Sequence, residues 1–215
     1  MQKKFPAILD AIREICVRYS IDEIGSCRVD LLTDREALQK MHNLLPGAKT
    51  VIVVLKKIPD GMIEHAHDPR YQEAAKRTFD DLCKASEEIA LGLRRSGMAA
   101  VWPGLEETPH QKEMAVRAGL GSIGDAKLFV SSRFGIDVHL ESLIADESIE
   151  FPKSEIINFS CDHCGLCIDV CPVNAIGPEG VNRSRCLQYR RAEVPEYNGM
   201  NTRFCGLCMK VCPQR

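Results

Sequence analysis

The hydrophobic pattern of the first half of the chain predicts a mixture of helices and strands. Apolar side chains at three- and four-residue steps from Phe5 to Tyr19 predict an amphipathic helix. The continuous run from Val51 to Leu55 is typical of a strand buried on both faces, and Pro59-Asp60-Gly61 predicts a turn after it. Helical spacing returns from Tyr71 to Leu93 and predicts a long second helix, ended by Gly97.

Shorter elements are predicted after this helix. Met98 to Trp102 predicts a short strand, and a third helix is expected from Thr108, as N-cap with Pro109 in the first turn, to Ala118. Further strands are predicted over Lys127 to Val130 and Ile136 to Ile144. This order predicts an α/β or α+β layer domain over residues 1–150.

Composition and charge narrow the class of protein. The net charge of −2 gives no general reason to expect nucleic acid or an anionic membrane as a partner. No apolar run approaches the roughly 20 residues that a membrane-spanning helix needs. The first residues continue into an amphipathic pattern instead of the apolar core of a signal peptide. We therefore expect a cytoplasmic protein without a membrane contact.

The cysteines are unevenly distributed. Of eleven, only Cys16, Cys27 and Cys83 precede residue 160, and the other eight fall between Cys161 and Cys212. A secreted scaffold would spread its cysteines through the fold that its disulfides staple. The concentration at one end of the chain instead indicates a metal site.

Two near-duplicate segments carry most of these cysteines. The first is Cys161-Asp-His-Cys164-Gly-Leu-Cys167-Ile-Asp-Val-Cys171-Pro172, and the second is Cys205-Gly-Leu-Cys208-Met-Lys-Val-Cys212-Pro213. Three cysteine thiolates, each separated from the next by two residues, can hold three irons of one cubane. The fourth cysteine, which is followed by proline, reaches a second cluster. The repeat is typical of a ferredoxin with two [4Fe–4S] clusters.

The second copy has Thr202 where its first cysteine is expected, and Cys186 is the only spare cysteine nearby. With Cys186 the count closes at two sets of four. We predict that one cluster is held by Cys161, Cys164, Cys167 and Cys212. The other is then held by Cys171, Cys186, Cys205 and Cys208.

Structural zinc is the main alternative, because zinc also binds four thiolates. Zinc sites usually pair two CxxC units across a longer gap, without the triple-cysteine run and the trailing proline. His163 and His139 are interpreted as exposed or satisfied histidines, and not as ligands. Cys16, Cys27 and Cys83 are interpreted as small core residues.

The domain boundary is expected near Phe151 to Ser160, where turn residues and cysteines begin to dominate. Residues 156–215 are predicted to form the ferredoxin-like domain with two [4Fe–4S] clusters. Residues 1–155 are predicted to form an α/β domain that binds a cofactor or a substrate. A bare two-cluster ferredoxin needs no such domain, so a second redox centre, a substrate pocket or a docking surface is implied.

Several strings in fixed order resemble the epoxyqueuosine reductase and reductive dehalogenase superfamily. They are Leu45-Pro46-Gly47 before Val51, Ala118-Gly119-Leu120-Gly121-Ser122-Ile123-Gly124, Arg133-Phe134-Gly135, and Arg185-Cys186-Leu187-Gln188-Tyr189, together with the cysteine pattern. The resemblance spans nearly the whole chain. It implies an α+β protein: an N-terminal nitroreductase-like α/β domain, followed by a bacterial ferredoxin-like domain with two [4Fe–4S] clusters.

The resemblance also implies an activity. In that superfamily electrons pass from a donor, such as a ferredoxin or a flavodoxin, through the clusters to cobalamin, which drives reductive removal of an oxygen or a halogen. Gly119, Gly121, Gly124 and Gln188 would then contact the corrinoid, or a flavin. Glycines allow the backbone to approach a flat cofactor closely. A tight turn between helix and strand explains the same glycines equally well.

The chain departs from the family pattern in three places. Where the reductases carry an aspartate as presumed proton donor, this chain has Glu106 and Glu107, so Glu107 is our first candidate acid and Glu106 the second. Either carboxylate could instead be a solvated residue at a helix N-terminus. The usual lysine after the last glycine is Asp125. The sequence also ends without the helical-repeat domain of the tRNA-acting members, so we do not expect tRNA to bind.

The sequence therefore favours an iron–sulfur reductase that uses a corrinoid on an unknown small-molecule substrate. One alternative is a non-catalytic electron-transfer partner, and another is a flavin-binding iron–sulfur reductase. Arg183, Arg185, Arg190 and Arg191, near Cys186, are interpreted as a solvated face or as a docking patch for the electron donor.

Overall fold

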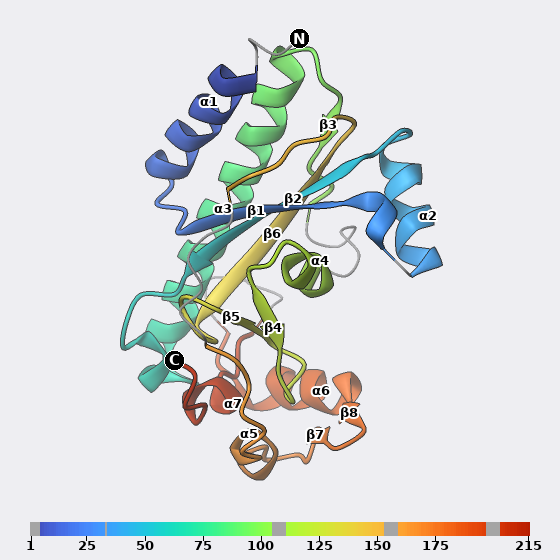
Figure 1. Ribbon diagram of the computed structural model, residues 1–215. Helices are drawn as coiled ribbons and strands as arrows, with labels where there is room; N and C mark the ends of the chain where they lie inside the picture. The colour runs from blue at the N-terminus through green and yellow to red at the C-terminus, as the bar shows by residue number, and fades with distance from the viewer. Residues whose placement is uncertain (1–4, 33, 105–110, 153–158, 197–202) are drawn as a thin grey trace. The chain divides into compact units, whose positions relative to one another are not determined.

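The computed structural model describes residues 5–32, 34–104, 111–152, 159–196 and 203–215 (Figure 1). Its chain forms two compact units. Unit 1 comprises residues 1–56, 79–120 and 139–154, and unit 2 comprises residues 57–78, 121–138 and 155–215. The cysteine-rich segment thus shares its unit with two segments from earlier in the chain. The division into domains 1–155 and 156–215 stays a prediction.

Unit 1 is built on a mixed arrangement of helices around a four-stranded sheet in the order β1-β2-β6-β3. Its elements are α1 (Phe5–Arg18), β1 (Glu23–Arg28), the 3-10 helix η1 (Val29–Leu31), α2 (Arg35–Leu44), β2 (Thr50–Lys57), β3 (Ala100–Val101), α4 (Gln111–Arg117), β6 (Val138–Ala145) and most of α3 (Pro69–Arg95). Strand β1 pairs antiparallel with β2, and β3 pairs antiparallel with β6.

Helices α1 and α3 cover one face of this sheet (Figure 1). Their apolar stripes, represented by Ile12 and Leu82, form one buried cluster with Ile52 and Val54 of β2. Because side chains alternate along a strand, Val51 and Val53 point to the opposite face, and they too are fully buried. The strand is therefore covered on both faces, as its continuous apolar run predicts.

The opposite face is closed in part by the end of α4, which packs against β1. Ile24 of β1 belongs to the cluster with α1 and α3, so its neighbour Gly25 points the other way. A Cβ atom at Gly25 would lie 2.9 Å from the Leu120 side chain, so only glycine fits without a shift of that side chain. This close approach fixes α4 and the segment after it against the sheet.

Unit 2 contains short elements and long loops. They are η2 (Met62–His65), the first residues of α3, β4 (Gly121–Ile123), β5 (Phe129–Ser131), α5 (Leu166–Asp169), β7 (Ile176–Gly177), β8 (Gly180–Val181), α6 (Arg183–Glu193) and α7 (Leu207–Lys210). Strands β4 and β5 form one antiparallel hairpin, and β7 and β8 form another. Its small apolar cluster contains Ile58, Ile63 and Tyr71, with Phe204 and Met209 packed against them.

The internal repeat of the sequence is visible as a structural repeat. Helices α5 and α7 each begin after a glycine in the left-handed region, Gly165 with φ of 79° and Gly206 with φ of 75°. A side chain costs free energy in this conformation, which explains the glycine at both positions. The surroundings differ, because a Cβ atom at Gly206 would lie 2.9 Å from the Tyr71 ring, whereas the space at Gly165 is open.

Most long elements predicted from the hydrophobic pattern are confirmed. The helices expected from Phe5 and Tyr71 are α1 and α3, the strand through Val51 is β2, and the strand from Ile136 is β6. The third helix is present as α4, while its predicted N-cap Thr108 and Pro109 lie outside the described residues. The mixed helix and sheet fold class is confirmed. Within the described residues, no helix has the length and apolar character that crossing a membrane requires.

The cysteines outside the repeat behave as small core residues. Cys27 is buried in β1, and Cys16 packs against the core cluster from α1. Burial raises the pKa of both thiols to about 11. Cys83, in α3, is half-buried.

His139 gives the stability of unit 1 a predicted pH dependence. It lies in β6 with its ring 5.9 Å from the Phe79 ring, and burial lowers its pKa from 6.5 to about 4. As the pH falls below 6.5, the unfolded chain takes up a proton that the folded chain refuses, so folding stability is lost between pH 6.5 and about 4. From pH 7 to pH 5.5, wild type should lose about 1 kcal/mol more unfolding free energy than His139→Gln.

This prediction is checked by urea unfolding followed through Trp102, the single tryptophan, which packs against the core of unit 1. His42→Gln is the matched control, because His42 is exposed on α2. Equal pH dependence of wild type and His139→Gln would contradict the buried-histidine account.

The two cap glycines allow a matched comparison. Gly165→Ala and Gly206→Ala should each lose about 1–2 kcal/mol from the left-handed backbone. Gly206→Ala should lose about 1–3 kcal/mol more, because its methyl group displaces the Tyr71 ring. Thermal unfolding by circular dichroism measures the order of Tm values, and equal losses would show that the Tyr71 contact does not matter.

Candidate metal centre

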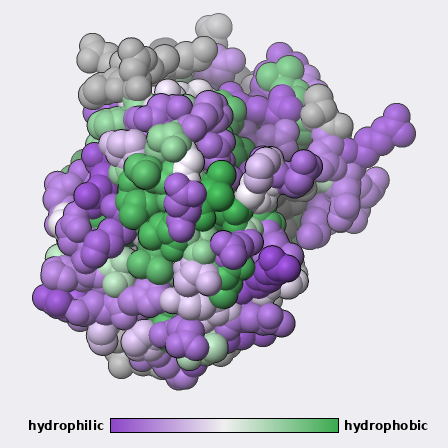
Figure 2. All heavy atoms as spheres, turned by 90° about the horizontal axis from the view of Figure 1, so that it is seen from below, coloured by the Kyte–Doolittle hydropathy of each residue, from purple (hydrophilic) through white to green (hydrophobic). Residues whose placement is uncertain are grey.

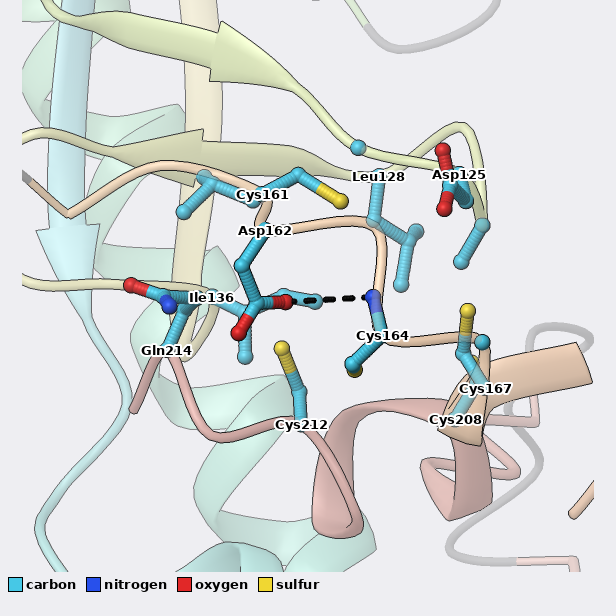
Figure 3. A pocket seen from close by; sticks show the side chains of 14 residues that line it. Asp125, Leu128, Ile136, Cys161, Asp162, Cys164, Cys167, Cys208, Cys212 and Gln214 are labelled. Carbon is cyan, nitrogen blue, oxygen red and sulfur yellow. Dashed lines mark hydrogen bonds between the residues drawn. The ribbon is translucent and has the colours of Figure 1, made fainter.

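The first cysteine loop leads directly into α5 and brings its thiols around one cavity in unit 2 (Figure 3). Cys161, Cys164, Cys167, Cys208 and Cys212 line this cavity. The turn is held locally, since the Cys164 backbone N–H donates to the Asp162 carboxylate at 3.3 Å. The remainder of the lining is largely apolar and includes Leu128, Val130 and Ile136.

Electrostatic interactions between thiols identify which cysteines are neighbours. Burial raises the pKa of the Cys212 thiol, and Cys164, Cys161 and Cys167 raise it further. This set of four matches the predicted first cluster. The structure brings the four together, and their role as ligands stays a prediction.

The other four cysteines are also grouped. Burial raises the pKa of the Cys205 thiol, and Cys186 and Cys171 add to the rise. Burial raises the pKa of Cys208 to about 12, with Cys205 and Cys186 among the further causes. Cys186 therefore lies near Cys205 and Cys208, and its role as the fourth ligand of this group stays a prediction. Cys167 also interacts with Cys208, so the two groups are adjacent.

The donor set fits iron–sulfur clusters chemically. Burial, together with neighbouring thiols, raises the pKa of Cys167, Cys205, Cys208 and Cys212 and keeps these four protonated, whereas a metal binds only thiolates. Cationic iron removes this penalty, because it compensates both the repulsion and the lost hydration. The residues are therefore suited to two four-thiolate centres held within one unit.

Two hydrogen-bonding groups contact sulfur atoms of the second group of cysteines. The Ala175 backbone N–H donates to the Cys171 sulfur at 3.2 Å. The His67 ring contributes a closer contact, with Nε2 3.0 Å from the Cys205 sulfur. Burial lowers the pKa of His67, which favours a neutral imidazole.

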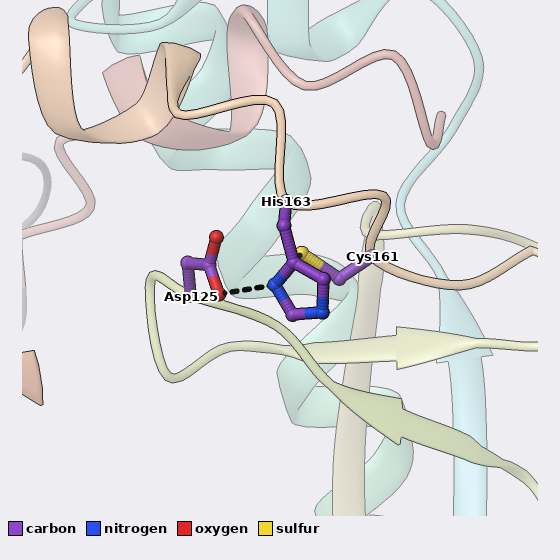
Figure 4. A group of neighbouring side chains, drawn as sticks. All are labelled: Asp125, Cys161 and His163. Atoms are coloured by element: carbon purple, nitrogen blue, oxygen red, sulfur yellow. Dashed lines mark hydrogen bonds and ion pairs between the residues drawn. The ribbon is translucent and has the colours of Figure 1, made fainter. Parts of the chain in front are cut away.

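A different arrangement lies beside the first group (Figure 4). His163 Nδ1 is 2.8 Å from Asp125 Oδ1 and 3.9 Å from the Cys161 sulfur. Asp125, which stands where the sequence comparison with the family led us to expect a lysine, thus places a carboxylate next to a cysteine loop. His163 is exposed and satisfied by this carboxylate, as expected for a histidine that is not a ligand.

The predicted cofactor glycines have partners or roles within the chain. Gly119 ends α4: its N–H donates to Val116 O and the Leu120 N–H to Ala115 O, the pattern of a Schellman cap. A Cβ atom at Gly121 would lie 2.8 Å from the Phe129 ring, inside the β4–β5 hairpin. These contacts agree with the turn interpretation of the glycine string.

Two of the predicted cofactor contacts have space beside them for a ligand, and the two candidate acids are not described by the structure. A Cβ atom at Gly119 would meet open space, and Gln188 is exposed on α6. At Gly124 the Cβ atom would lie 3.3 Å from the Cys161 Cβ, so this glycine serves the cysteine loop. The candidate acids Glu106 and Glu107 lie outside the described residues.

Sequence reasoning missed His67 as part of the site. It stands 138 positions before Cys205, and no spacing rule connects them. The available signal was the turn His67-Asp68-Pro69 at the start of a long helix, and this signal indicates only a loop.

The chain has recognisable relatives. Residues 160–215 match the family model described as a 4Fe-4S dicluster domain. The epoxyqueuosine reductase of Lactococcus garvieae is 29% identical over 59% of this chain and 35% of that protein. The tetrachloroethene reductive dehalogenase of Dehalobacter restrictus is 29% identical over 56% of this chain and 22% of that protein. The chain thus spans little more than a third of the first relative.

Solved structures show the same fold. The epoxyqueuosine reductase of Streptococcus thermophilus aligns with a TM-score of 0.62 at 21% identity, over 94% of this chain and 65% of that one. A reductive dehalogenase whose structure suggests a mechanism for B12-dependent dehalogenation aligns with a TM-score of 0.71 at 21% identity, over 95% of this chain and 31% of that one. The chain is therefore similar in sequence to epoxyqueuosine reductases and reductive dehalogenases and shares their fold, and its residues 160–215 match a 4Fe-4S dicluster domain.

Proposed function

We propose that this protein is an iron–sulfur reductase that passes electrons through two [4Fe–4S] clusters to a bound corrinoid. The observation that carries the proposal is the grouping of eight cysteines into two adjacent sets of four within unit 2. The named reductases among its relatives support a reductive reaction. The substrate is proposed to be a small molecule and not tRNA, because the net charge of −2 offers no general attraction for a polyanion.

The chain's own residues would hold and insulate the clusters. Cys161, Cys164, Cys167 and Cys212 would hold one, and Cys171, Cys186, Cys205 and Cys208 the other. The apolar lining formed by Leu128, Val130 and Ile136 limits water beside the first cluster. Limited water protects a reduced cluster and is one of the factors that set its potential.

The corrinoid is proposed from the B12-dependent dehalogenase among the structural neighbours. When bound, it would supply a cobalt centre that accepts electrons from the clusters and delivers them to the substrate. Gly119 and Gln188 are the predicted contacts with free space around them. Glu107, or Glu106, is proposed to deliver a proton to the substrate, as a carboxylic acid can when burial raises its pKa.

An electron donor is the expected macromolecular partner. Figure 2 shows one face of the molecule on which hydrophobic side chains gather in the middle and hydrophilic ones surround them. Patches of this kind commonly mark interaction sites. We propose a ferredoxin or a flavodoxin as the donor, since both carry single electrons at low potential.

Cys186 is the most specific prediction of the ligand assignment. Cys186→Ala should lower the iron content from about eight to about four atoms per chain, because one cluster loses a ligand and the other keeps all four. Cys83→Ala is the control, as Cys83 lies in α3 of unit 1. Iron analysis and EPR of the reduced protein measure the outcome, and an unchanged iron content in Cys186→Ala would show that another residue is the ligand.

Cobalamin binding tests the cofactor. The reconstituted protein should bind about one equivalent of cobalamin, and binding should change the absorption spectrum of the cobalamin. When the clusters are reduced, they should in turn reduce the bound cobalamin. Protein without clusters serves as the control for the electron transfer. A protein that neither binds cobalamin nor reduces it is not a corrinoid enzyme. In that case, FMN or FAD released on denaturation would identify a flavin enzyme, and a stoichiometric protein partner would identify an electron carrier.

A further inference from the structure

His67 is held in place against the second group of cysteines. It lies between η2 and α3 with φ of 72°, and its ring is 5.7 Å from the Tyr189 ring of α6. The next residue, Asp68, is fixed by hydrogen bonds from the Arg70 backbone and side chain. The imidazole thus contacts both the Tyr189 ring and the Cys205 sulfur, with its Nε2 3.0 Å from that sulfur.

An N–H group directed at a ligand sulfur changes the properties of a cluster. Reduction adds one negative charge to the cluster and its thiolates. A hydrogen bond to a thiolate stabilises the more negative state more strongly, so it raises the reduction potential.

The first group of cysteines has the opposite surroundings. The same nitrogen of His163 that approaches the Cys161 sulfur is 2.8 Å from the Asp125 carboxylate, which takes the shorter contact. A carboxylate oxygen of Asp125, a ring nitrogen of His163 and the Cys161 sulfur all lie within 4.8 Å of one another. A carboxylate at this position disfavours extra negative charge on the cluster and lowers its potential.

We propose that His67 donates a hydrogen bond to the Cys205 thiolate and, with Asp125 beside the other group, sets the two clusters at unequal reduction potentials. The cluster at Cys205 has the higher potential. With both clusters bound, an electron would move from the reduced cluster at Cys161 to the oxidised cluster at Cys205, without transfer of a proton or a group. The inference rests on the proposed function, since it requires both clusters.

The test is a potentiometric titration of the reconstituted full chain, followed by EPR. His67→Phe keeps a ring beside Tyr189 and removes the N–H, so the higher potential should fall by the equivalent of a tenfold change in equilibrium, about 59 mV for one electron. The lower potential, that of the cluster at Cys161, should not change. His67→Gln retains an N–H donor and should restore most of the shift.

Asp125→Asn tests the other cluster. Removal of the carboxylate charge should raise the lower potential and so reduce the difference between the two reduction potentials. His65→Gln is the matched control, because it changes a histidine in the same segment, two residues from His67, and should move neither potential. A merely structural role for His67 would leave both potentials in place wherever the clusters assemble.

The outcomes separate the two proposals. A chain that binds no clusters contradicts the proposed function. A chain with two clusters whose potentials are unchanged in His67→Phe contradicts only the role of His67. If His67→Phe fails to assemble, pulsed EPR of wild type labelled with 15N-histidine decides: a weak 15N coupling at the higher-potential cluster supports the hydrogen bond, and its absence overturns it.

Discussion

The ionisation of closely grouped and mostly half-buried thiols is the constraint on which unit 2 depends. Eight cysteines are held in two adjacent groups, and burial raises the pKa of several of them, Cys208 to about 12. Without a metal, a thiol whose pKa is raised in this way stays protonated. With cationic iron the same arrangement becomes favourable, because each thiolate loses repulsion and gains a bond.

Segments outside the cysteine repeat complete this unit. Gln72 accepts a hydrogen bond from the Phe204 backbone at 2.9 Å, just before Cys205. The Ile136 backbone N–H donates to Gln214 O at 2.7 Å, just after Cys212. Gly124 lies against Cys161. Both ends of the cysteine module are therefore fixed by residues 57–78 and 121–138, so the metal centre and the first part of the chain are built together.

The sequence predicted those features whose signal is local. Apolar period and run length identified α1, α3 and β2, because burial of one face or of both leaves a direct trace in hydropathy. Strand β1, with Gly25 and Ser26 among its residues, was missed because its pairing with β2 overrides its weak strand propensity. Helix α2 was also missed, although Asp34, which accepts from the Glu36 and Ala37 backbones, was a readable N-cap.

At the candidate site, counting and spacing identified the eight cysteines that the structure brings together in unit 2, including Cys186, which carries no motif of its own, while their division into two ligand sets stays a prediction. Spacing could not find His67 or the contact of Asp125 with His163, because these depend on tertiary folding across long separations. The glycine string illustrates the converse limit. The structure gives each glycine a role within the chain, Gly119 as a helix cap, Gly121 in the hairpin and Gly124 against the Cys161 loop, while contact with a cofactor stays a prediction.

The most direct test of the account is the metal and sulfide content of the full chain after strictly anaerobic purification. The account predicts about eight iron and eight acid-labile sulfide per chain, with the absorption of [4Fe–4S] centres and an EPR signal on reduction. Two equivalents of zinc without sulfide, or disulfides among these cysteines, would contradict it.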